Sequence, residues 1–440
     1  MKKANSQIAC FILSICVMLS AVVGLTACTV PVSENYSSYN GITSARLNER
    51  GELIVSYADG REQNLGAVSN EGTTISIEKA EGDISAATTA GLAGAVSITA
   101  NFEKTYSYGG FFPGYGGTTT TPYKSEGSGV FYRLDRNTGS AFIITNYHVV
   151  YDKSSNSENG ISENIEVFLY GAEEEEYAIS AEYVGGSLYY DIAVLYVEDC
   201  PALKNSAHNA PVIADSENVA VGATAIAIGN PEGYGISASL GIVSVNSEYI
   251  TMTAADGVST VSFRVMRVDT AVNSGNSGGG LYNEQGELIG IVNAKIVDSS
   301  VENIGYAIPS NVAAAVADNI IDNCFEKENK SVARAVLGVT FATSNSMAVI
   351  DEVSGIIKVK ETVSVAEISD DSVASGKVFV GDVLKKASLN GKTVDITRRH
   401  HLIDLMLDAR VGDTLYLEIV RGGEERTVEI NVTEDAILEY

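Results

Sequence analysis

Short segments in which apolar and polar residues alternate make up most of this chain, and turn residues separate them. The first three lie between residues 42 and 65, where Asp59-Gly60 between alternating segments is a strong hairpin signal. They predict a short β-meander, which is too small to bury a core by itself. Polar stretches on both sides make residues 29–83 a tether that carries this meander.

From residue 84 onward the alternating segments fall into two groups of about six, which fits two β-barrels. The predicted strands of these groups cover residues 95–100, 127–132, 140–145, 165–170, 177–184, 192–197, 224–228, 241–245, 249–253, 262–268 and 288–296. A short helix is expected at 86–92. The stretch from Tyr106 to Tyr123 is rich in Gly, Thr and aromatic residues, and we predict a long mobile loop there.

The pattern changes towards the C-terminus. Pro309-Ser310 opens a segment rich in Ala, Val and Ile, which predicts a helix over residues 311–324. Beyond a charged hinge, residues 337–432 predict strands around a helix at 398–407. This part forms a separate small α+β domain, so the chain as a whole falls in the all-β dominated class.

Composition describes a globular protein of more than one domain, since the chain has 440 residues, of which 45% are hydrophobic. The formal charge of −27, from 56 acidic against 29 basic residues, argues against nucleic acid as a partner. The sequence contains no Gly-x-x-x-x-Gly-Lys and no His-Glu-x-x-His motif. We therefore expect no cofactor and no metal.

The N-terminus has the pattern of an export signal, with Lys2 and Lys3 before an apolar run from Ile8 to Leu25. The run ends in Leu-Thr-Ala-Cys28, which resembles the bacterial lipoprotein signal, in which the cysteine is lipidated. The alternative is an uncleaved helix, because about 18 apolar residues just cross a bilayer. Both interpretations place the bulk of the chain outside the cytoplasm.

Two cysteines, Cys200 and Cys324, remain after this N-terminal segment. They lie far apart in a chain that is not a small disulfide-dense scaffold, so we expect both to stay thiols.

A candidate nucleophile lies in the segment from Asp269 to Gly290, whose centre is Ser277. Glycines at positions 275, 278, 279 and 280 surround this hydroxyl. Glycine allows backbone angles barred to other residues and lets a substrate approach the main-chain N–H groups closely. A serine becomes a nucleophile only with a base to take its proton and donors for the oxyanion. The alternative is a plain Gly/Ser turn between strands.

Of the histidines, His148, His208, His400 and His401, only His148 follows an apolar strand in the same predicted domain as Ser277. An imidazole is the natural base for a serine hydroxyl near pH 7. A lone histidine at a strand end is nevertheless more often structural than catalytic.

The base also needs a carboxylate that fixes its tautomer. Asp191 is the best candidate because it immediately precedes an apolar strand, where acidic residues are uncommon unless paired. On position alone, Asp199 and Asp269 remain rivals.

His148 in "TNYHVV", Asp191 in "YDIAVL" and Ser277 in "NSGNSGGGL" occur in the order His, Asp, Ser. With "AIGNP" at 227–231 and "GYAIPSN" at 305–311, the chain resembles the HtrA (high-temperature-requirement) family of exported serine proteases. The resemblance implies two chymotrypsin-like β-barrels. It also implies that His148 is the general base and then acid, that Asp191 orients it, and that Ser277 is the nucleophile.

The resemblance implies further site residues. The oxyanion hole would consist of the N–H groups of Gly275 and Ser277, with Asn276 between them shaping the loop. The primary specificity pocket would lie along Asn293, Ala294 and Lys295. Gly280 departs from the family, which usually has Pro or Ala there, and glycine loosens the backbone after the nucleophile.

The C-terminal part resembles a bacterial PDZ domain at residues 337–339, 355–363, 379–384 and 412–415. Such a domain takes an extended C-terminal peptide as an added strand. Backbone donors at Leu337, Gly338 and Val339 would hold the terminal carboxylate. The alternative is a small β-rich domain that only packs against the protease.

Together these observations predict five parts. They are a lipoprotein-type signal or anchor (1–28), a tether with the β-meander (29–83), a trypsin-like protease (84–326), a linker (327–335) and a PDZ domain (336–434). We expect a membrane-tethered, ATP-independent endoprotease of unfolded or misfolded proteins, which binds C-terminal peptides at the PDZ domain and, by the resemblance, forms a homotrimer. The alternatives from other classes are a proteolytically silent chaperone-like binder and an adaptor lipoprotein.

Overall fold

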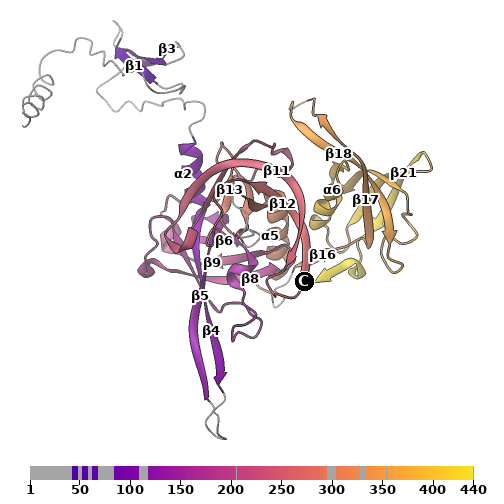
Figure 1. Cartoon of the computed structure of the whole chain (residues 1–440), viewed down its shortest axis with the longest axis horizontal. Helices are drawn as coiled ribbons and strands as arrows, with labels where there is room; N and C mark the ends of the chain where they lie inside the picture. The colour runs from indigo at the N-terminus through magenta and orange to yellow at the C-terminus, as the bar shows by residue number, and fades with distance from the viewer. Residues whose placement is uncertain are drawn as a thin grey trace, which may run out of the picture. The chain divides into compact units, whose positions relative to one another are not determined.

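The computed structural model describes residues 42–47, 52–57, 62–67, 84–108, 117–204, 206–294, 304–327, 332–352 and 355–439. The predicted signal with Cys28, the polar parts of the tether, and Lys295 lie outside the described residues. Two compact units make up the chain, residues 1–83 and 84–440. In the first unit, β1 (Ile42–Leu47), β2 (Glu52–Tyr57) and β3 (Glu62–Ala67) pair antiparallel in this order (Figure 1).

The second unit begins with α2 (Ser85–Gly94), followed by a closed β-barrel with strand order β4-β5-β6-β9-β8-β7. Its strands are β4 (Ala95–Tyr108), β5 (Gly117–Asp135), β6 (Ser140–Thr145), β7 (Asn164–Leu169), β8 (Ile179–Ser187) and β9 (Ile192–Val197). Alternate residues such as Ile98, Ile143 and Leu195 are fully buried and fill the barrel. The alternation in the sequence therefore marks the inward face of each strand.

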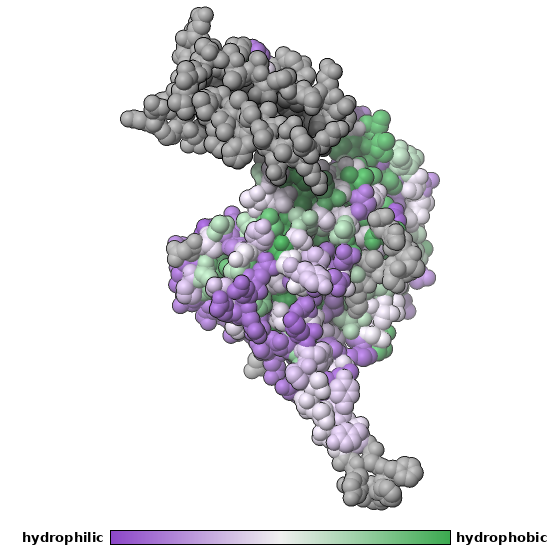
Figure 2. Space-filling model, turned by 60° about the vertical axis from the view of Figure 1, so that its left-hand side comes forward, coloured by the Kyte–Doolittle hydropathy of each residue, from purple (hydrophilic) through white to green (hydrophobic). Residues whose placement is uncertain are grey.

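The prediction of a loop from Tyr106 to Tyr123 is wrong at both ends of this segment, where the residues belong to strands. β4 and β5 stay paired from Ala95 to Tyr108, so these segments form a long antiparallel ribbon that extends from the barrel (Figure 1). Figure 2 shows pale, weakly polar residues along this ribbon, which matches its Thr, Ser and Tyr content. Thr is β-branched and suits a strand even where neither face is buried.

A second closed barrel follows, with strand order β10-β11-β12-β15-β14-β13. Its strands are β10 (Thr224–Gly229), β11 (Ser237–Thr253), β12 (Thr260–Val268), β13 (Gly280–Tyr282), β14 (Leu288–Val292) and β15 (Gly305–Pro309). The two strands predicted at 241–245 and 249–253 are one continuous strand. Register shifts against β12 between Val243 and Glu248 interrupt its alternation, which explains the apparent break.

Helix α5 (Ser310–Cys324) packs on β8 and β9 of the first barrel and on β14 of the second. Val312, Val316 and Ile320, spaced by four residues, line its buried face. One apolar cluster runs through α5 and both barrels, so the helix joins them into a single body.

The C-terminal part has its own core and a sheet of order β17-β18-β19-β21-β22, with β20 on β19. Its elements are β16 (Ala333–Ala335), β17 (Val339–Ile350), β18 (Ile357–Ile368), β19 (Val383–Leu389), β20 (Lys392–Asp395), α6 (Arg399–Leu405), η5 (Met406–Asp408), β21 (Thr414–Arg421), β22 (Glu424–Asn431), η6 (Glu434–Ala436) and β23 (Ile437–Glu439). β16 pairs with β23, so the two ends of this part are tied together.

Short helical turns connect the strands elsewhere: α3 (Tyr147–Val150), η1 (Glu175–Tyr177), α4 (Pro201–Lys204), η2 (Ser216–Asn218) and η3 (Pro231–Gly233). No helix within the described part of the chain has the length and apolar character needed to cross a bilayer. Cys200 and Cys324 are not joined in a disulfide.

Candidate active site

Three predicted site residues come together from three different segments. His148 lies in the helical turn α3 directly after β6, Asp191 immediately precedes β9, and Ser277 lies in the loop before β13. The first two belong to the first barrel and the third to the second barrel, so the group lies where the barrels meet.

Hydrogen bonds connect the three side chains in a row. His148 Nδ1 lies 2.7 Å from Asp191 Oδ2, and His148 Nε2 lies 2.9 Å from Ser277 Oγ. An ionised carboxylate only accepts, so the proton of the neutral imidazole lies on Nδ1. Nε2 is then left to accept from the serine hydroxyl. This arrangement can take a proton from Ser277.

Asp191 is held by several donors although it is almost completely buried, with 5% exposure. His148 donates its backbone N–H to Oδ1 at 2.9 Å, and the Asn293 amide donates to Oδ2 at 2.8 Å. Burial raises the pKa of Asp191, but its electrostatic interaction with His148 and these hydrogen bonds outweigh the effect of burial, so the pKa lies below its ordinary value. The carboxylate therefore stays ionised beside the imidazole.

The backbone at Asp191 has a φ of +53°, which is uncommon for a residue with a side chain. The Asn146 amide donates to the Asp191 carbonyl at 2.8 Å and fixes this turn. Such conformations persist where the surroundings over-determine them, and they cluster at functional sites.

The loop around Ser277 is shaped by glycines with positive φ, +90° at Gly275 and +84° at Gly278. A Cβ at Gly275 would lie 2.2 Å from the Asn230 carbonyl oxygen, and one at Gly278 would lie 2.2 Å from the Ser128 carbonyl oxygen. Only glycine fits at these two positions.

Ser128, from β5, clamps this loop. Its N–H donates to the Ser277 carbonyl at 2.8 Å, and its hydroxyl donates to the Gly275 carbonyl at 2.6 Å. The same hydroxyl accepts from the N–H of Asn230, at 2.8 Å, just after β10. The loop conformation thus depends on one residue from each barrel.

The N–H groups of the loop divide into two kinds. Asn276 donates its backbone N–H to the Asn273 carbonyl at 3.0 Å. For the N–H groups of Gly275 and Ser277, no acceptor occurs among the described residues. These two donors remain available for an oxygen of a ligand.

Gly280 does not serve as a flexible position, contrary to the expectation from sequence. It is a paired residue of β13, between Ile228 and Ile291. A Cβ there would lie 2.4 to 2.5 Å from atoms of the Tyr282 ring, which is completely buried. The missing side chain makes room for that ring.

The predicted specificity residues have different surroundings. Asn293 is fully buried, and its amide contacts Asp191, a role that the sequence did not indicate. Ala294 is half-buried, and Lys295 lies outside the described residues. Ser128, Asn146 and Asn230 were also missed, although a polar residue within an apolar strand pattern is a signal for such contacts.

A pocket of about 270 Å³ lies at the start of β17, and its lining includes Leu337, Gly338 and Val339. Leu402, Ile403 and Met406 of α6 and η5 form the opposite wall. The N–H groups of Leu337 and Gly338 have no acceptor among the described residues. The pocket therefore combines apolar walls with backbone donors.

Comparison with known proteins adds four findings: a family model, two relatives and a solved structure. A family model described as "Trypsin-like peptidase domain" matches residues 127–291. The chain is 30% identical over 351 residues to "Serine protease Do-like HtrA" of Lactococcus lactis subsp. lactis (strain IL1403), covering 76% of this chain and 78% of that protein. It is 29% identical over 314 residues to "Periplasmic pH-dependent serine endoprotease DegQ" of Escherichia coli (strain K12), covering 71% and 60%.

A similar solved structure is "HtrA-type protease AlgW with decapeptide", at a TM-score of 0.49 and 22% identity, covering 80% of this chain and 98% of that one.

Proposed function

Because this chain belongs to the HtrA family of serine endopeptidases, we propose that His148, Asp191 and Ser277 are its catalytic triad. The observation that carries the proposal is the unbroken row of hydrogen bonds from Asp191 through His148 to Ser277, at 2.7 and 2.9 Å. The protease fold is chymotrypsin-like, and it supplies one triad segment from the second barrel and two from the first.

In the proposed mechanism, Ser277 Oγ attacks the scissile carbonyl carbon while His148 Nε2 takes the hydroxyl proton. The C–N bond then breaks, and His148 gives its proton to the leaving amine, which leaves an acyl-enzyme. Water then attacks the ester while His148 takes its proton, the C–O bond to Ser277 breaks, His148 returns the proton to Ser277 Oγ, and the acyl group departs as a carboxylic acid. Asp191 stabilises the imidazolium in both steps because it remains ionised.

The proposed oxyanion hole consists of the N–H groups of Gly275 and Ser277, and Asn276 shapes the turn between them. Removing one such donor typically costs about 100-fold to 1,000-fold in turnover. The backbone angles of Gly275 and Gly278 and the Ser128 clamp support this assignment, because they hold the donors in place before a substrate arrives. We propose the primary specificity pocket at Asn293, Ala294 and Lys295.

The C-terminal part is proposed to be a PDZ domain that takes C-terminal peptides. β17 is at the edge of its sheet, so an extended peptide can add beside it as a further strand. The peptide carboxylate would accept from the N–H groups at Leu337, Gly338 and Val339, while its last side chain enters the apolar pocket against Leu402 and Met406.

We further propose that the enzyme works outside the cytoplasm on unfolded or damaged proteins, without ATP. It would be anchored to the membrane through lipidated Cys28 or an N-terminal helix and assembled as a homotrimer, with the β-meander as spacer. The proposed domain limits are those given by the sequence, with the protease at 84–326 and the PDZ domain at 336–434.

The test is cleavage of casein by the wild type and by Ser277→Ala, with and without a peptide that ends in a hydrophobic residue. We expect cleavage by the wild type only, and faster cleavage with the peptide. If the wild type is no more active than the variant under any of these conditions, the proposed mechanism fails. Sedimentation and membrane fractionation of the same proteins test the trimer and the anchor.

A further inference from the structure

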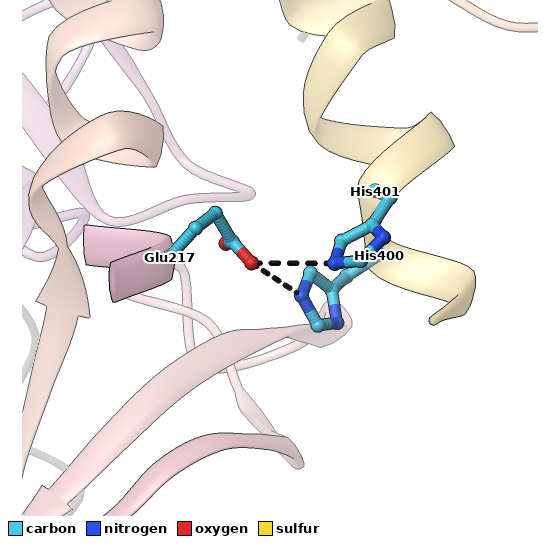
Figure 3. A group of neighbouring side chains, drawn as sticks. All are labelled: Glu217, His400 and His401. Atoms are coloured by element: carbon cyan, nitrogen blue, oxygen red, sulfur yellow. Dashed lines mark hydrogen bonds and ion pairs between the residues drawn. The ribbon is translucent and has the colours of Figure 1, made fainter. Parts of the chain in front are cut away.

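A cluster remote from the proposed triad joins two parts of the second unit. Glu217 lies in η2, before β10, whereas His400 and His401 lie in α6 of the C-terminal part. Figure 3 shows both imidazoles directed at one carboxylate oxygen. Glu217 Oε2 lies 3.1 Å from His400 Nε2 and 3.3 Å from His401 Nε2.

The second nitrogen of His401 has two polar neighbours. Nδ1 lies 2.8 Å from the Asp395 carbonyl oxygen, which can only accept, and 3.3 Å from the Thr397 backbone nitrogen, whose N–H donates to it; the shorter contact favours a proton on Nδ1. In the neutral ring, Nε2 then presents a lone pair to Glu217 Oε2, which also presents lone pairs. Two acceptors at 3.3 Å need either a proton or a metal cation between them.

The second nitrogen of His400 faces a hydroxyl, which can donate or accept, so this contact does not select a tautomer. His400 Nδ1 lies 3.5 Å from the Ser247 hydroxyl, and the His400 side chain is 3% exposed. Burial favours the uncharged imidazole, which is the form that binds metals. Histidines that bind metals typically use their other ring nitrogen to donate to a carbonyl or another polar group, and the Asp395 carbonyl oxygen beside His401 Nδ1 is such an acceptor.

The distances suit a tetrahedral metal. Zinc bonds to histidine nitrogen and carboxylate oxygen measure about 2.0–2.2 Å, so neighbouring ligand atoms in a tetrahedron lie about 3.3–3.5 Å apart. The two Oε2–Nε2 distances, 3.1 and 3.3 Å, come close to such edges. All three ligand atoms lie within 4.8 Å of one another. Small side-chain movements would complete the geometry.

The surrounding charges leave the cluster net negative. Arg264, with a side chain that is 3% exposed, contacts the other oxygen of Glu217, Oε1, and so leaves Oε2 to the histidines. Its second amino group pairs with Asp404 at 2.6 Å. With neutral histidines, two carboxylates face one guanidinium.

A pocket of about 330 Å³ borders the cluster at His400, the one of the three side chains that lines it, and includes Glu248 and Glu361 among its lining residues. The nearby arginines are engaged elsewhere, since Arg398 lies 3.7 Å from Glu361 and Arg399 lies over the Tyr249 ring. Water from this pocket would supply a fourth ligand.

We propose that Glu217, His400 and His401 bind one Zn²⁺ ion, which links the protease to the C-terminal domain. Because the ligands come from both parts, the ion binds fully only when α6 is docked against η2. The metal is structural and takes no part in peptide hydrolysis.

The test is titration of the purified full-length chain with Zn²⁺ against a chromophoric chelator, after treatment with EDTA. The variants His401→Gln and Glu217→Gln each remove one ligand and keep a polar side chain. His208→Gln, in the loop after α4, is the matched control. We expect one zinc equivalent more for the wild type and His208→Gln than for the two ligand variants. In the ligand variants the zinc affinity at this site should fall about 100-fold or more. The loss of even a residue that only hydrogen-bonds to a metal ligand lowers metal affinity about 10-fold to 100-fold.

Thermal unfolding provides the second readout. Zn²⁺ should raise the Tm of the wild type and of His208→Gln but leave that of the ligand variants unchanged, because ligands that bind only the folded state stabilise it. Melting and circular dichroism in EDTA show whether the variants fold. The proposal is overturned if the wild type does not bind zinc, or if it binds no more tightly than His401→Gln and Glu217→Gln.

Discussion

A glycine close to Ser277 can provide either flexibility or room for a neighbouring side chain. At Gly280 the sign of the change in the free energy of unfolding on substitution by alanine distinguishes the two. If Gly280 were present for flexibility, Gly280→Ala would stabilise the protein by about 0.4–1 kcal/mol, through loss of entropy in the unfolded chain. The structure predicts the opposite. The new Cβ would lie 2.4 Å from Cε2 and 2.5 Å from Cζ of Tyr282, which is well inside van der Waals contact.

The Tyr282 ring has little room to move away. It is completely buried, and a Cβ built at Gly91 of α2 would lie 3.0 Å from its Cδ2 and 3.1 Å from its Cε2, so the ring is also packed closely against α2. Overpacking of this kind typically costs about 1–3 kcal/mol. We therefore expect Gly280→Ala to lower the free energy of unfolding by about 2 kcal/mol.

The assay is urea unfolding of four proteins in a Ser277→Ala background, which prevents self-cleavage. They are the parent, Gly280→Ala, Tyr282→Leu, and the double variant, since leucine lacks the ring atoms that the new Cβ would meet. Gly280→Ala should lower the free energy of unfolding by about 2 kcal/mol when residue 282 is tyrosine and by close to nothing when it is leucine. A double-mutant cycle measures this difference as a coupling energy. An equal cost in both backgrounds, or a stabilising Gly280→Ala, would refute the packing argument.

Two further predictions concern carboxylates. Asn293→Ala removes a donor to the ionised Asp191, which is worth about 1.5–3 kcal/mol, so kcat for a peptide ester should fall about 10-fold to 100-fold; an unchanged kcat would contradict the role of Asn293. Burial raises the pKa of Asp382, but two hydrogen bonds from Arg421, each of 2.7 Å, outweigh burial and lower the pKa. The ionised carboxylate therefore contributes stability that is present above pH ~4 and is lost as the pH falls through the pKa of the folded state. The unfolding free energies of wild type and Asp382→Asn should thus differ by about 2 kcal/mol at pH 7 and converge below pH 4, and a gap that is constant with pH would contradict this.

Strands with one buried face could be predicted from the sequence, because alternation reports burial directly. β6 and β9 have the bounds that the pattern predicts, Ser140–Thr145 and Ile192–Val197. β13 and β15 were missed, since three and five residues give no measurable period. The ends of the β4–β5 ribbon were taken for a loop because neither face is buried there, so no alternation exists.

Local motifs could indicate the residues of the proposed triad, but not the contacts that hold them. Asn293 and Asp191 are 102 residues apart, and Ser128 and Gly275 are 147 apart. Glu217 and His400, 183 residues apart, could not be associated from sequence either. Such pairs are determined by barrel closure and by docking of α6, which no short-range pattern encodes. The expectation of no metal came from the absence of short motifs alone.

Ser128 has a consequence for how the chain acquires activity. It comes from the first barrel, yet it clamps the loop around Ser277 together with Asn230 of the second barrel. A chain in which only one barrel has folded therefore has neither the loop conformation nor the base beside its serine. Under the proposed function, hydrolytic activity arises only with the last step of folding, so a nascent or partly folded chain is spared from cutting its neighbours or itself.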